Sequence, residues 1–398
     1  MTLRAIIYLA GMGLLCSALT SCEGLQTVGN SGPHGVASVG PVYPGIASYV
    51  VADALEGRVV LAYMPDQKRS IASITKIATA VIVLDFLRAG SGNVDEVMTV
   101  PQSVLGLGVP SALGLQAGDG ISVRDALYAA MMGSDNFAAE TLGSHFGARL
   151  SQAGLGGAPL QAFVTQMNGL RSKLNLSNTR FANPHGLDLP NASGYSCASD
   201  VARLLNHAIT TPGFTFYCSQ KDRRIVFLRG GAPQYLTVHN TNEIIGQNRI
   251  DAGKTGTTSL AGPCLAVTAA KPATVIKRGD GSTLVIPHRL TVVVLAAPDR
   301  FPATSRLLAD GWARYDAWRA NGSPAGTAAE YLGAGPSAAA APAAAVPAPA
   351  PRPVAPQAAA YPSAPPAYPA APAPNYAPPP PSYAPPAYPS GGYQPMPY

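Results

Sequence analysis

The sequence predicts an α+β fold in which one antiparallel sheet, assembled from both ends of a central region, is flanked by helices. Near the start of that region two apolar segments meet at Glu56-Gly57, a pattern typical of a β-hairpin. Long stretches rich in Ala, Leu, Ile and Val occupy the middle, and β-branched segments return before a last helical stretch. A hairpin, a helical block, late strands and a closing helix are most simply accommodated by one sheet with helices packed against it.

The patterns of apolar and turn residues also predict where each helix and strand begins and ends. The hairpin should comprise residues 47–53 and 58–63, and an apolar helix should follow at 73–87. A second helical zone at 123–146 is interrupted around Gly133-Ser134. Further helices are expected at residues 162–174, 198–209 and 303–318, and further strands at 224–228, 235–239, 249–254, 264–270, 284–287 and 291–296.

The N-terminal end predicts export. Residues 1–21 contain one charge, Arg4, then an apolar stretch at 5–15 and small residues before Cys22, as in a secretory signal peptide. The apolar stretch is short for a membrane span, and an uncleaved anchor helix is the alternative. Leu-Thr-Ser-Cys22 resembles a bacterial lipobox, which implies that Cys22 is lipidated and anchors the protein to a membrane. Cleavage nearby by an ordinary signal peptidase would instead give a soluble protein, and residues 22–45 are expected to be a linker in either case.

The C-terminal end, residues 322–398, predicts a disordered tail. From residue 336 onward it holds 22 of the 39 prolines and 7 of the 17 tyrosines, and its only charge there is Arg352. Proline lacks a backbone donor and disfavours helix and sheet, so this segment is expected to be extended, with polyproline II character. It is interpreted as a spacer, with a binding segment as the alternative.

Between these ends, residues 46–321 are enough for one large domain, or two small ones, with a proper core. The chain has 27 Lys and Arg against 21 Asp and Glu and no basic run, which excludes nucleic acid as a partner. Cys197 and Cys218 either close a disulfide loop of about twenty residues or remain buried free thiols, and Cys264 is expected to pack as a thiol. No cysteine–histidine spacing is typical of a metal site, so neither a metal nor a cofactor is expected.

The residues that can carry chemistry lie in three short motifs. In Ser73-Ile-Thr-Lys76 the serine and the lysine are three residues apart, so both lie on one face of the expected helix. A hydroxyl beside an amine is the minimum for a serine nucleophile that works without histidine. Because the helix is otherwise apolar, Lys76 must be paired or have a lowered pKa; the alternative is a lysine that extends to solvent at the helix end.

Two further motifs complete the set. Lys254-Thr-Gly256 ends an expected strand and can present donors to an anion, while its glycine lets a substrate backbone approach closely. A second lysine near Lys76 would also help to keep Lys76 neutral by like-charge repulsion. Ser134-Asp-Asn136 offers a hydroxyl for proton relay and an amide for a peptide carbonyl. A solvated strand end and an ordinary helix N-cap are the simpler alternatives for these two motifs.

In this order, the three motifs resemble those of the D-alanyl-D-alanine carboxypeptidase family, the low-molecular-mass penicillin-binding proteins. Further segments share that resemblance: residues 181–187, 198–205, 239–242 and 261–265. The resemblance implies a β-lactamase/transpeptidase-like fold with an all-helical lobe. It also implies an exported enzyme at the periplasmic face of a bacterial membrane, which removes the terminal D-alanine from peptidoglycan stem pentapeptides and binds β-lactams covalently.

The resemblance further implies a role for each matching residue. Ser73 would attack the penultimate D-alanine, and Lys76 would take the proton of its hydroxyl. Ser134 with Lys254 would pass a proton to the departing D-alanine, and Asn136 would hold the peptide group of the substrate. The pocket for the substrate and its carboxylate would comprise Lys254, Thr255, Gly256, Thr257 and Arg300. The oxyanion hole would consist of the backbone amides of Ser73 and Thr257.

The match has departures, and other functions remain open. Asp135 occupies the middle of the second motif, where glycine is commoner in the family, and the C-terminal β-rich domain and anchor helix of some members are not expected here. A serine β-lactamase is one alternative, but Glu140 and Glu243, the only glutamates between the second and third motifs, do not lie in the setting expected for activating its deacylating water. A DD-endopeptidase and a non-catalytic wall-binding lipoprotein are the others.

Overall fold

The computed structural model of the chain describes residues 35–90, 92–155, 157–190, 193–324, 326–327 and 330–333. All of them belong to one unit, Met1–Val346. The expected signal peptide, Cys22 and nearly all of the Pro-rich tail lie outside the described residues.

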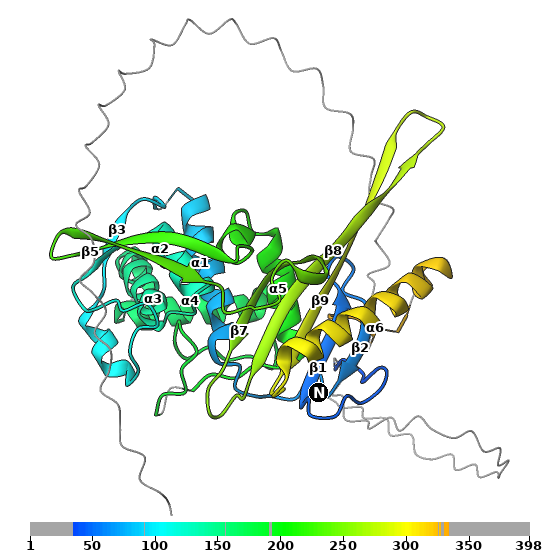
Figure 1. The fold of residues 1–398 in the computed structure, drawn as a ribbon, viewed down its shortest axis with the longest axis horizontal. Coiled ribbons are helices and arrows are strands. Elements are labelled where there is room, and N and C mark those ends of the chain that lie inside the picture. The colour runs from blue at the N-terminus through cyan, green and yellow to red at the C-terminus, as the bar shows by residue number, and fades with distance from the viewer. Residues whose placement is uncertain are drawn as a thin grey trace, which may run out of the picture. The chain divides into compact units, whose positions relative to one another are not determined.

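A five-stranded antiparallel sheet brings the two ends of the described region together (Figure 1). Its order is β2-β1-β9-β8-β7, with strands β1 (Ser48–Asp53), β2 (Val59–Tyr63), β7 (Ile250–Gly256), β8 (Cys264–Lys277) and β9 (Thr283–Leu295). The early strand β1 pairs along its whole length with the late strand β9, from Ser48 opposite Leu295 to Asp53 opposite Leu290. This confirms the predicted sheet assembled from both ends of the chain.

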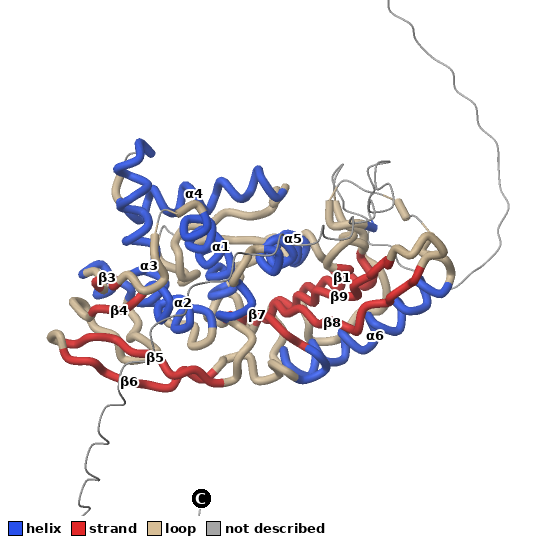
Figure 2. Tube along the Cα trace, turned by 90° about the horizontal axis from the view of Figure 1, so that it is seen from above, coloured by secondary structure: helices blue, strands red, loops and turns tan. Residues whose placement is uncertain are grey.

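Each face of this sheet is covered by its own hydrophobic core. Successive residues of a strand point to opposite faces, so Val50 enters the core on one side and Val51 enters the core on the other. Helix α6 (Arg300–Ala320) covers the Val51 side, and helix α5 (Ala198–Thr210) packs on the Val50 side. Figure 2 shows the sheet between these two helices. Because both faces are buried, the central strands are continuously apolar.

The other long helices form a lobe beside the sheet (Figure 2). They are α1 (Lys76–Arg88), α2 (Val123–Met131), α3 (Asn136–Leu150) and α4 (Pro159–Leu174). The first nine residues of α1, Lys76 to Leu84, are all buried, which explains its apolar sequence. Short helical turns complete the described fold: η1 (Ala72–Thr75), η2 (Gln102–Leu107), η3 (Ser151–Leu155), η4 (Phe214–Tyr217) and η5 (Gln247–Arg249). Within the described ranges, no helix combines the length and the hydropathy that crossing a membrane requires.

The helical lobe also carries a second antiparallel sheet, which the sequence does not predict. Its order is β3-β4-β5-β6, with strands β3 (Val97–Thr99), β4 (Gly120–Ser122), β5 (Asp222–Arg229) and β6 (Ala232–His239). The hairpin predicted at 224–228 and 235–239 is present, but it joins β4 instead of the five-stranded sheet. The strands β3 and β4 have only three residues each, too few to show an alternating pattern in the sequence.

Strands β8 and β9 extend beyond the rest of their sheet as a long hairpin (Figure 1). The neighbouring strands β7 and β1 pair only with their inner halves, so the outer halves pair only with each other. The sequence predicts two strands at 284–287 and 291–296, whereas the structure has one. Pro272 and Pro287 both fall in an irregularity of the β8–β9 ladder, where a proline interrupts no regular pairing.

Candidate active site

Ser73 lies on η1, a single 3-10 turn that leads into α1, and not on the helix itself as the sequence predicts. The turn is strained, because the preceding Ala72 has a φ of 48°, a left-handed conformation that is unfavourable for a residue with a side chain. Gly186 packs so closely against this turn that a β-carbon there would lie 1.9 Å from the carbonyl oxygen of Ala72. Strain of this kind persists only where the surroundings hold it in place, and it is common at catalytic residues.

Lys76, one turn further on, is 1% exposed and has a full set of partners. Its Nζ lies 2.8 Å from each of three atoms, Ser73 Oγ, Asn136 Oδ1 and the backbone oxygen of His185. Burial lowers the pKa of Lys76 to about 7, an effect that the charge of Asp135 partly opposes. A substantial fraction of the Lys76 amines is therefore neutral at neutral pH.

The partners of Lys76 determine where its lone pair points. A neutral amine has two N–H groups and one lone pair, and both Asn136 Oδ1 and the His185 carbonyl can only accept hydrogen bonds. These two atoms therefore take the N–H groups, and the lone pair is left facing the hydroxyl of Ser73. This is the geometry that a general base needs to remove the Ser73 proton.

The second motif lies at the break between α2 and α3. Ser134 has a φ of 58°, a second left-handed residue at the site. Its hydroxyl makes no hydrogen bond with the other residues that the structure describes. Asp135 is fully buried and caps α3, where its Oδ1 accepts from the Ala138 amide at 2.8 Å. Its Oδ2 accepts from Ser111 Oγ at 2.5 Å and from the Leu113 amide at 3.0 Å, so the carboxylate also holds the loop that follows η2.

The third motif forms the end of β7, the edge strand nearest the helical lobe (Figures 1 and 2). Lys254 is 1% exposed, and its Nζ donates to the backbone oxygen of Thr255 at 3.0 Å. Burial, followed by the charges of Lys76 and Arg300, lowers the pKa of Lys254 well below its usual range. A β-carbon on Gly256 would lie 3.1 Å from the backbone nitrogen of Ser73. The third motif therefore runs directly beside the first.

Arg300 joins this group from the start of α6. Its Nη1 donates to Thr257 Oγ1 at 2.7 Å and to the backbone oxygen of Gly256 at 3.2 Å. Thr255 Oγ1 lies 2.6 Å from Thr241 Oγ1, and Thr241 in turn bonds the Met132 carbonyl at the end of α2. The result is a cluster of hydroxyl groups beside the Arg300 guanidinium, next to the turn that carries Ser73, and such a cluster suits a carboxylate.

The structure brings the first and third motifs and Asn136 of the second together around Lys76, and Ser134 lies two residues before Asn136 in the chain. The predicted residues that meet are Ser73, Lys76, Asn136, Lys254, Thr255, Gly256, Thr257 and Arg300. His185 and Thr241 belong to the same site but are not predicted as members of it. They lie in the segments 181–187 and 239–242 that the resemblance marks. His185 acts through a backbone oxygen, however, which no side-chain pattern reveals.

The predicted lipidation site and the possible disulfide lie outside this group of residues. Cys22 lies outside the described residues. Cys197 and Cys218 are free and buried, so the disulfide that the sequence leaves open is not formed. Each thiol has a partner close to it in sequence: Cys197 Sγ lies 3.2 Å from Ser199 Oγ, and Cys218 Sγ donates to the backbone oxygen of Phe214 at 3.7 Å.

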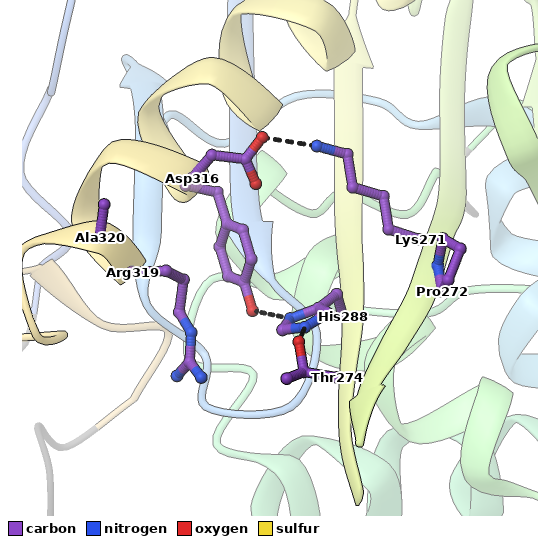
Figure 3. Close-up of a pocket in the computed structure, with 8 residues that line it drawn as sticks. Lys271, Pro272, Thr274, His288, Asp316, Arg319 and Ala320 are labelled. Atoms are coloured by element: carbon purple, nitrogen blue, oxygen red, sulfur yellow. Dashed lines mark hydrogen bonds and ion pairs between the residues drawn. The ribbon is translucent and has the colours of Figure 1, made fainter. Parts of the chain in front are cut away.

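A cavity of about 430 Å³ lies away from the three motifs, between the hairpin of β8 and β9 and the end of α6 (Figure 3). Five of the polar side chains that line it are paired with one another. Lys271 Nζ binds Asp316 Oδ2 at 2.6 Å, and the His288 ring contacts Thr274 and Tyr315 at 2.7 and 2.9 Å. Within the described ranges, no group of three His, Cys, Asp or Glu side chains is arranged to hold a metal.

Comparison with known proteins identifies the same family that the three motifs resemble. The family profile for D-alanyl-D-alanine carboxypeptidases matches residues 44–277. A D-alanyl-D-alanine endopeptidase of Pseudomonas aeruginosa is 35% identical over 223 residues, which are 55% of this chain and 65% of the relative. The D-alanyl-D-alanine carboxypeptidase DacC of Escherichia coli is 30% identical over 275 residues, or 67% of this chain and 60% of the relative. The matched regions are less than two thirds of either relative.

Solved structures share the fold. The Streptomyces K15 DD-transpeptidase, at 24% identity, superimposes with a TM-score of 0.58 over 69% of this chain and 100% of its own. Penicillin-binding protein 6B of Escherichia coli, at 27% identity, has a TM-score of 0.53 over 70% of this chain and 79% of its own. Penicillin-binding protein D2 of Listeria monocytogenes in its cefotaxime-bound form, at 26% identity, has a TM-score of 0.54 over 69% of this chain and 100% of its own.

The fold is that of the solved penicillin-binding proteins, and the site places a buried lysine beside a serine. The family profile spans more than half of the chain. The chain belongs to the D-alanyl-D-alanine carboxypeptidase family.

Proposed function

We propose that this protein is a serine D-alanyl-D-alanine carboxypeptidase, which removes the terminal D-alanine from peptidoglycan stem pentapeptides and is acylated by penicillins. The observation that carries the proposal is the environment of Lys76. Two obligate acceptors take its N–H groups and leave its lone pair toward Ser73 Oγ, 2.8 Å away. A buried amine with a pKa lowered to about 7 is suited to act as a general base near neutral pH.

The acylation step follows from this arrangement. Ser73 Oγ attacks the carbonyl carbon of the penultimate D-alanine, while its proton passes to Lys76 Nζ. The developing oxyanion is stabilised by the backbone amides of Ser73 and Thr257, and each such donor typically contributes about 3 kcal/mol. Lys254 and Arg300, with the hydroxyls of Thr255 and Thr257, bind the terminal carboxylate, and Asn136 holds the preceding peptide group.

Departure of D-alanine needs a proton on its nitrogen. Ser134, together with Lys254, would pass that proton. Its left-handed backbone, and a hydroxyl that makes no hydrogen bond with the other described residues, are consistent with the role. Water then hydrolyses the ester on Ser73, which releases the shortened peptide and restores the hydroxyl.

The test is D-alanine release from a pentapeptide that ends in D-Ala-D-Ala, with Ser73→Ala as control. The proposal expects release by the wild type, no release by the variant and a covalent penicillin adduct on Ser73. Rapid turnover of penicillin without D-alanine release would favour the β-lactamase alternative. A wild type that neither releases D-alanine nor takes up penicillin would favour a non-catalytic wall-binding lipoprotein.

A DD-endopeptidase is the second candidate, because the relatives from Pseudomonas aeruginosa and Escherichia coli with 35% and 33% identity carry that name. The same Ser73 acyl-enzyme would form from a cross-linked peptide, with the side-chain amine of a second stem as leaving group. Cleavage of purified cross-linked dimers, measured against pentapeptide trimming, separates the two activities.

Location and domain organisation are part of the proposal. We infer a signal peptide at 1–21, a lipid on Cys22, a linker at 22–45, a catalytic domain at 46–321 and an Ala/Pro/Tyr-rich tail at 322–398. The protein would then act at the periplasmic face of a bacterial membrane, where its substrate is. Mass spectrometry of the mature N-terminus tests the anchor: an unmodified end downstream of Cys22 would contradict it.

A further inference from the structure

Two buried titratable residues, Glu140 and His185, lie behind Lys76 and belong to none of the three motifs. The side chains of His185 and Glu140 are 1% and 4% exposed, and His185 Nε2 lies 3.6 Å from Glu140 Oε2. Ser103 Oγ donates to the other oxygen, Glu140 Oε1, at 2.8 Å. A carboxyl group this deeply buried is unfavourable unless its oxygens have partners, so the pair calls for an explanation.

The hydrogen bonds fix the tautomer of His185. Its Nδ1 accepts from the Leu187 backbone amide at 3.1 Å, so the proton of the neutral ring resides on Nε2. Burial, followed by the charge of Lys76, lowers the pKa of His185 to about 3, and the ring is neutral under physiological conditions. The Nε2–H therefore faces Glu140 Oε2, and the ring bridges the turn that contains Leu187 to helix α3.

His185 provides one of the two acceptors of Lys76, and Glu140 lies on the same helix as Asn136, which provides the other. The backbone oxygen of His185 takes one N–H of Lys76, and Asn136 Oδ1 takes the other. Glu140 lies on α3 four residues after Asn136, so the two side chains share a helix face. The contact between Glu140 and His185 is thus a side-chain bridge between the two segments that orient the lone pair of Lys76.

We propose that Glu140 is a positioning residue for the acylation step: its contact with the His185 ring holds the His185 carbonyl and Asn136 at the angle that directs Lys76 Nζ toward Ser73 Oγ. This inference rests on the proposed function and deepens it, because it adds a residue to the same site. Small displacements of a general base are costly, since a misplacement of about 1 Å can slow a reaction on the order of 100-fold.

The experiment compares Glu140→Leu with Glu140→Gln in the full chain, with a fluorescent penicillin as the probe. Glutamine keeps an oxygen that can accept from His185 Nε2–H, whereas leucine keeps the volume and removes the acceptor. The limiting acylation rate is expected to fall on the order of 10- to 100-fold in Glu140→Leu, with the half-saturating penicillin concentration nearly unchanged. Glu140→Gln is expected to restore the rate to within about 3-fold of wild type, because its amide oxygen can restore the polar contact with the His185 ring.

Two controls separate positioning from stability. Glu96→Gln alters a different glutamate–histidine contact, that of Glu96 with His145 of α3. Both of these residues lie outside the three motifs. Ser103→Ala removes only the hydrogen bond to Glu140 Oε1 and leaves the contact with His185. Both are expected to acylate at nearly the wild-type rate, whatever their effect on thermal unfolding.

The inference is overturned if the folded Glu140→Leu protein acylates at the wild-type limiting rate. The rate is normalised to the end-point labelling, so that only the folded, reactive fraction is compared. Equal losses in Glu140→Leu and Glu140→Gln would also overturn it, because they would show that the accepting oxygen is irrelevant. Wild-type acylation without D-alanine release would count against the carboxypeptidase function alone and leave the comparison of rates intact.

Discussion

Replacing Lys76 with methionine is expected to stabilise the protein while it abolishes acylation. Burial lowers the pKa of Lys76 from 10.5 to about 7. Each pKa unit corresponds to about 1.4 kcal/mol, so the folded state disfavours the ammonium form by about 5 kcal/mol. Methionine has a similar length and no charge to bury.

The gain is smaller than this figure, because methionine cannot bond the three partners of Lys76. A typical hydrogen bond contributes about 1 kcal/mol, so the loss of three offsets about 3 kcal/mol. The net expectation at pH 7 is a stabilisation of about 1 to 2 kcal/mol, or roughly 2 to 8 °C in Tm for a domain of this size.

The pH dependence of this difference gives the sharper test. The folded-state pKa of Lys76 lies below the unfolded one, so between about pH 7 and 10.5 the unfolded state binds one more proton. The wild type therefore gains up to about 1.4 kcal/mol of stability per pH unit in this range from this group, and the variant does not. The advantage of Lys76→Met is widest at and below pH 7 and disappears about 1 to 1.5 pH units higher. Toward pH 10.5 the variant becomes the less stable protein by about 3 kcal/mol, because the three lost hydrogen bonds then remain as the only difference.

Urea unfolding of both proteins at pH 6, 7, 8 and 9 measures the difference. Titrating groups that do not interact with Lys76 cancel because both proteins contain them, whereas the pKa values of Lys254 and His185 respond to the charge of Lys76. Penicillin labelling of the same samples checks that the variant is inactive. A stability difference that does not change with pH would refute the reasoning. It would mean that Lys76 is buried with a pKa close to its unfolded value.

Four other substitutions have expected outcomes. Ser73→Ala should remove the covalent penicillin label on a denaturing gel and lower D-alanine release by at least ~1,000-fold, and an undiminished label would rule out this nucleophile. Asp135→Ala should cost about 2 to 4 kcal/mol in urea unfolding, because it removes a helix cap and two hydrogen bonds to the loop after η2. Because the charge of Asp135 raises the pKa of Lys76, the same variant should move the acid limb of acylation, near pH 7 in the wild type, to lower pH; an unmoved limb would contradict this. Gly186→Ala should lower stability by about 2 kcal/mol or more and slow acylation, and wild-type behaviour would show that the turn before Ser73 can move aside. Arg300→Leu should raise KM for the pentapeptide about 10-fold or more with a smaller change in kcat, and the reverse pattern would place Arg300 in the chemical step.

Much of the architecture was accessible from the sequence, because it depends on periodic patterns and short motifs. The hairpin of β1 and β2, the break between α2 and α3 and the closing helix α6 each have a clear signal. The three motifs fix which side chains gather, since each ends or begins an element whose direction is predictable. The sheet that joins β1 to β9 follows from the order of the elements alone.

The remainder depends on contacts that no local pattern encodes. The strands β3 and β4 are too short to alternate, and the continuity of β9 depends on Pro287 falling in a bulge opposite Pro272. The role of His185 resides in its backbone oxygen and in a ring that meets Glu140 from a different segment. Asp135 looks like a departure from the family motif, yet the structure uses its carboxylate to cap a helix and hold a loop.

The three cysteines in the described part of the chain, Cys197, Cys218 and Cys264, have a practical consequence for laboratory work. All three are buried, and burial raises the pKa of Cys197 and Cys218 to about 12, so these thiols are protonated and hidden from reagents at neutral pH. The described fold holds without a covalent cross-link, so it is compatible with production in a reducing cytosol. A cysteine engineered onto its surface should react selectively with a spectroscopic label, against a quiet background from these native thiols.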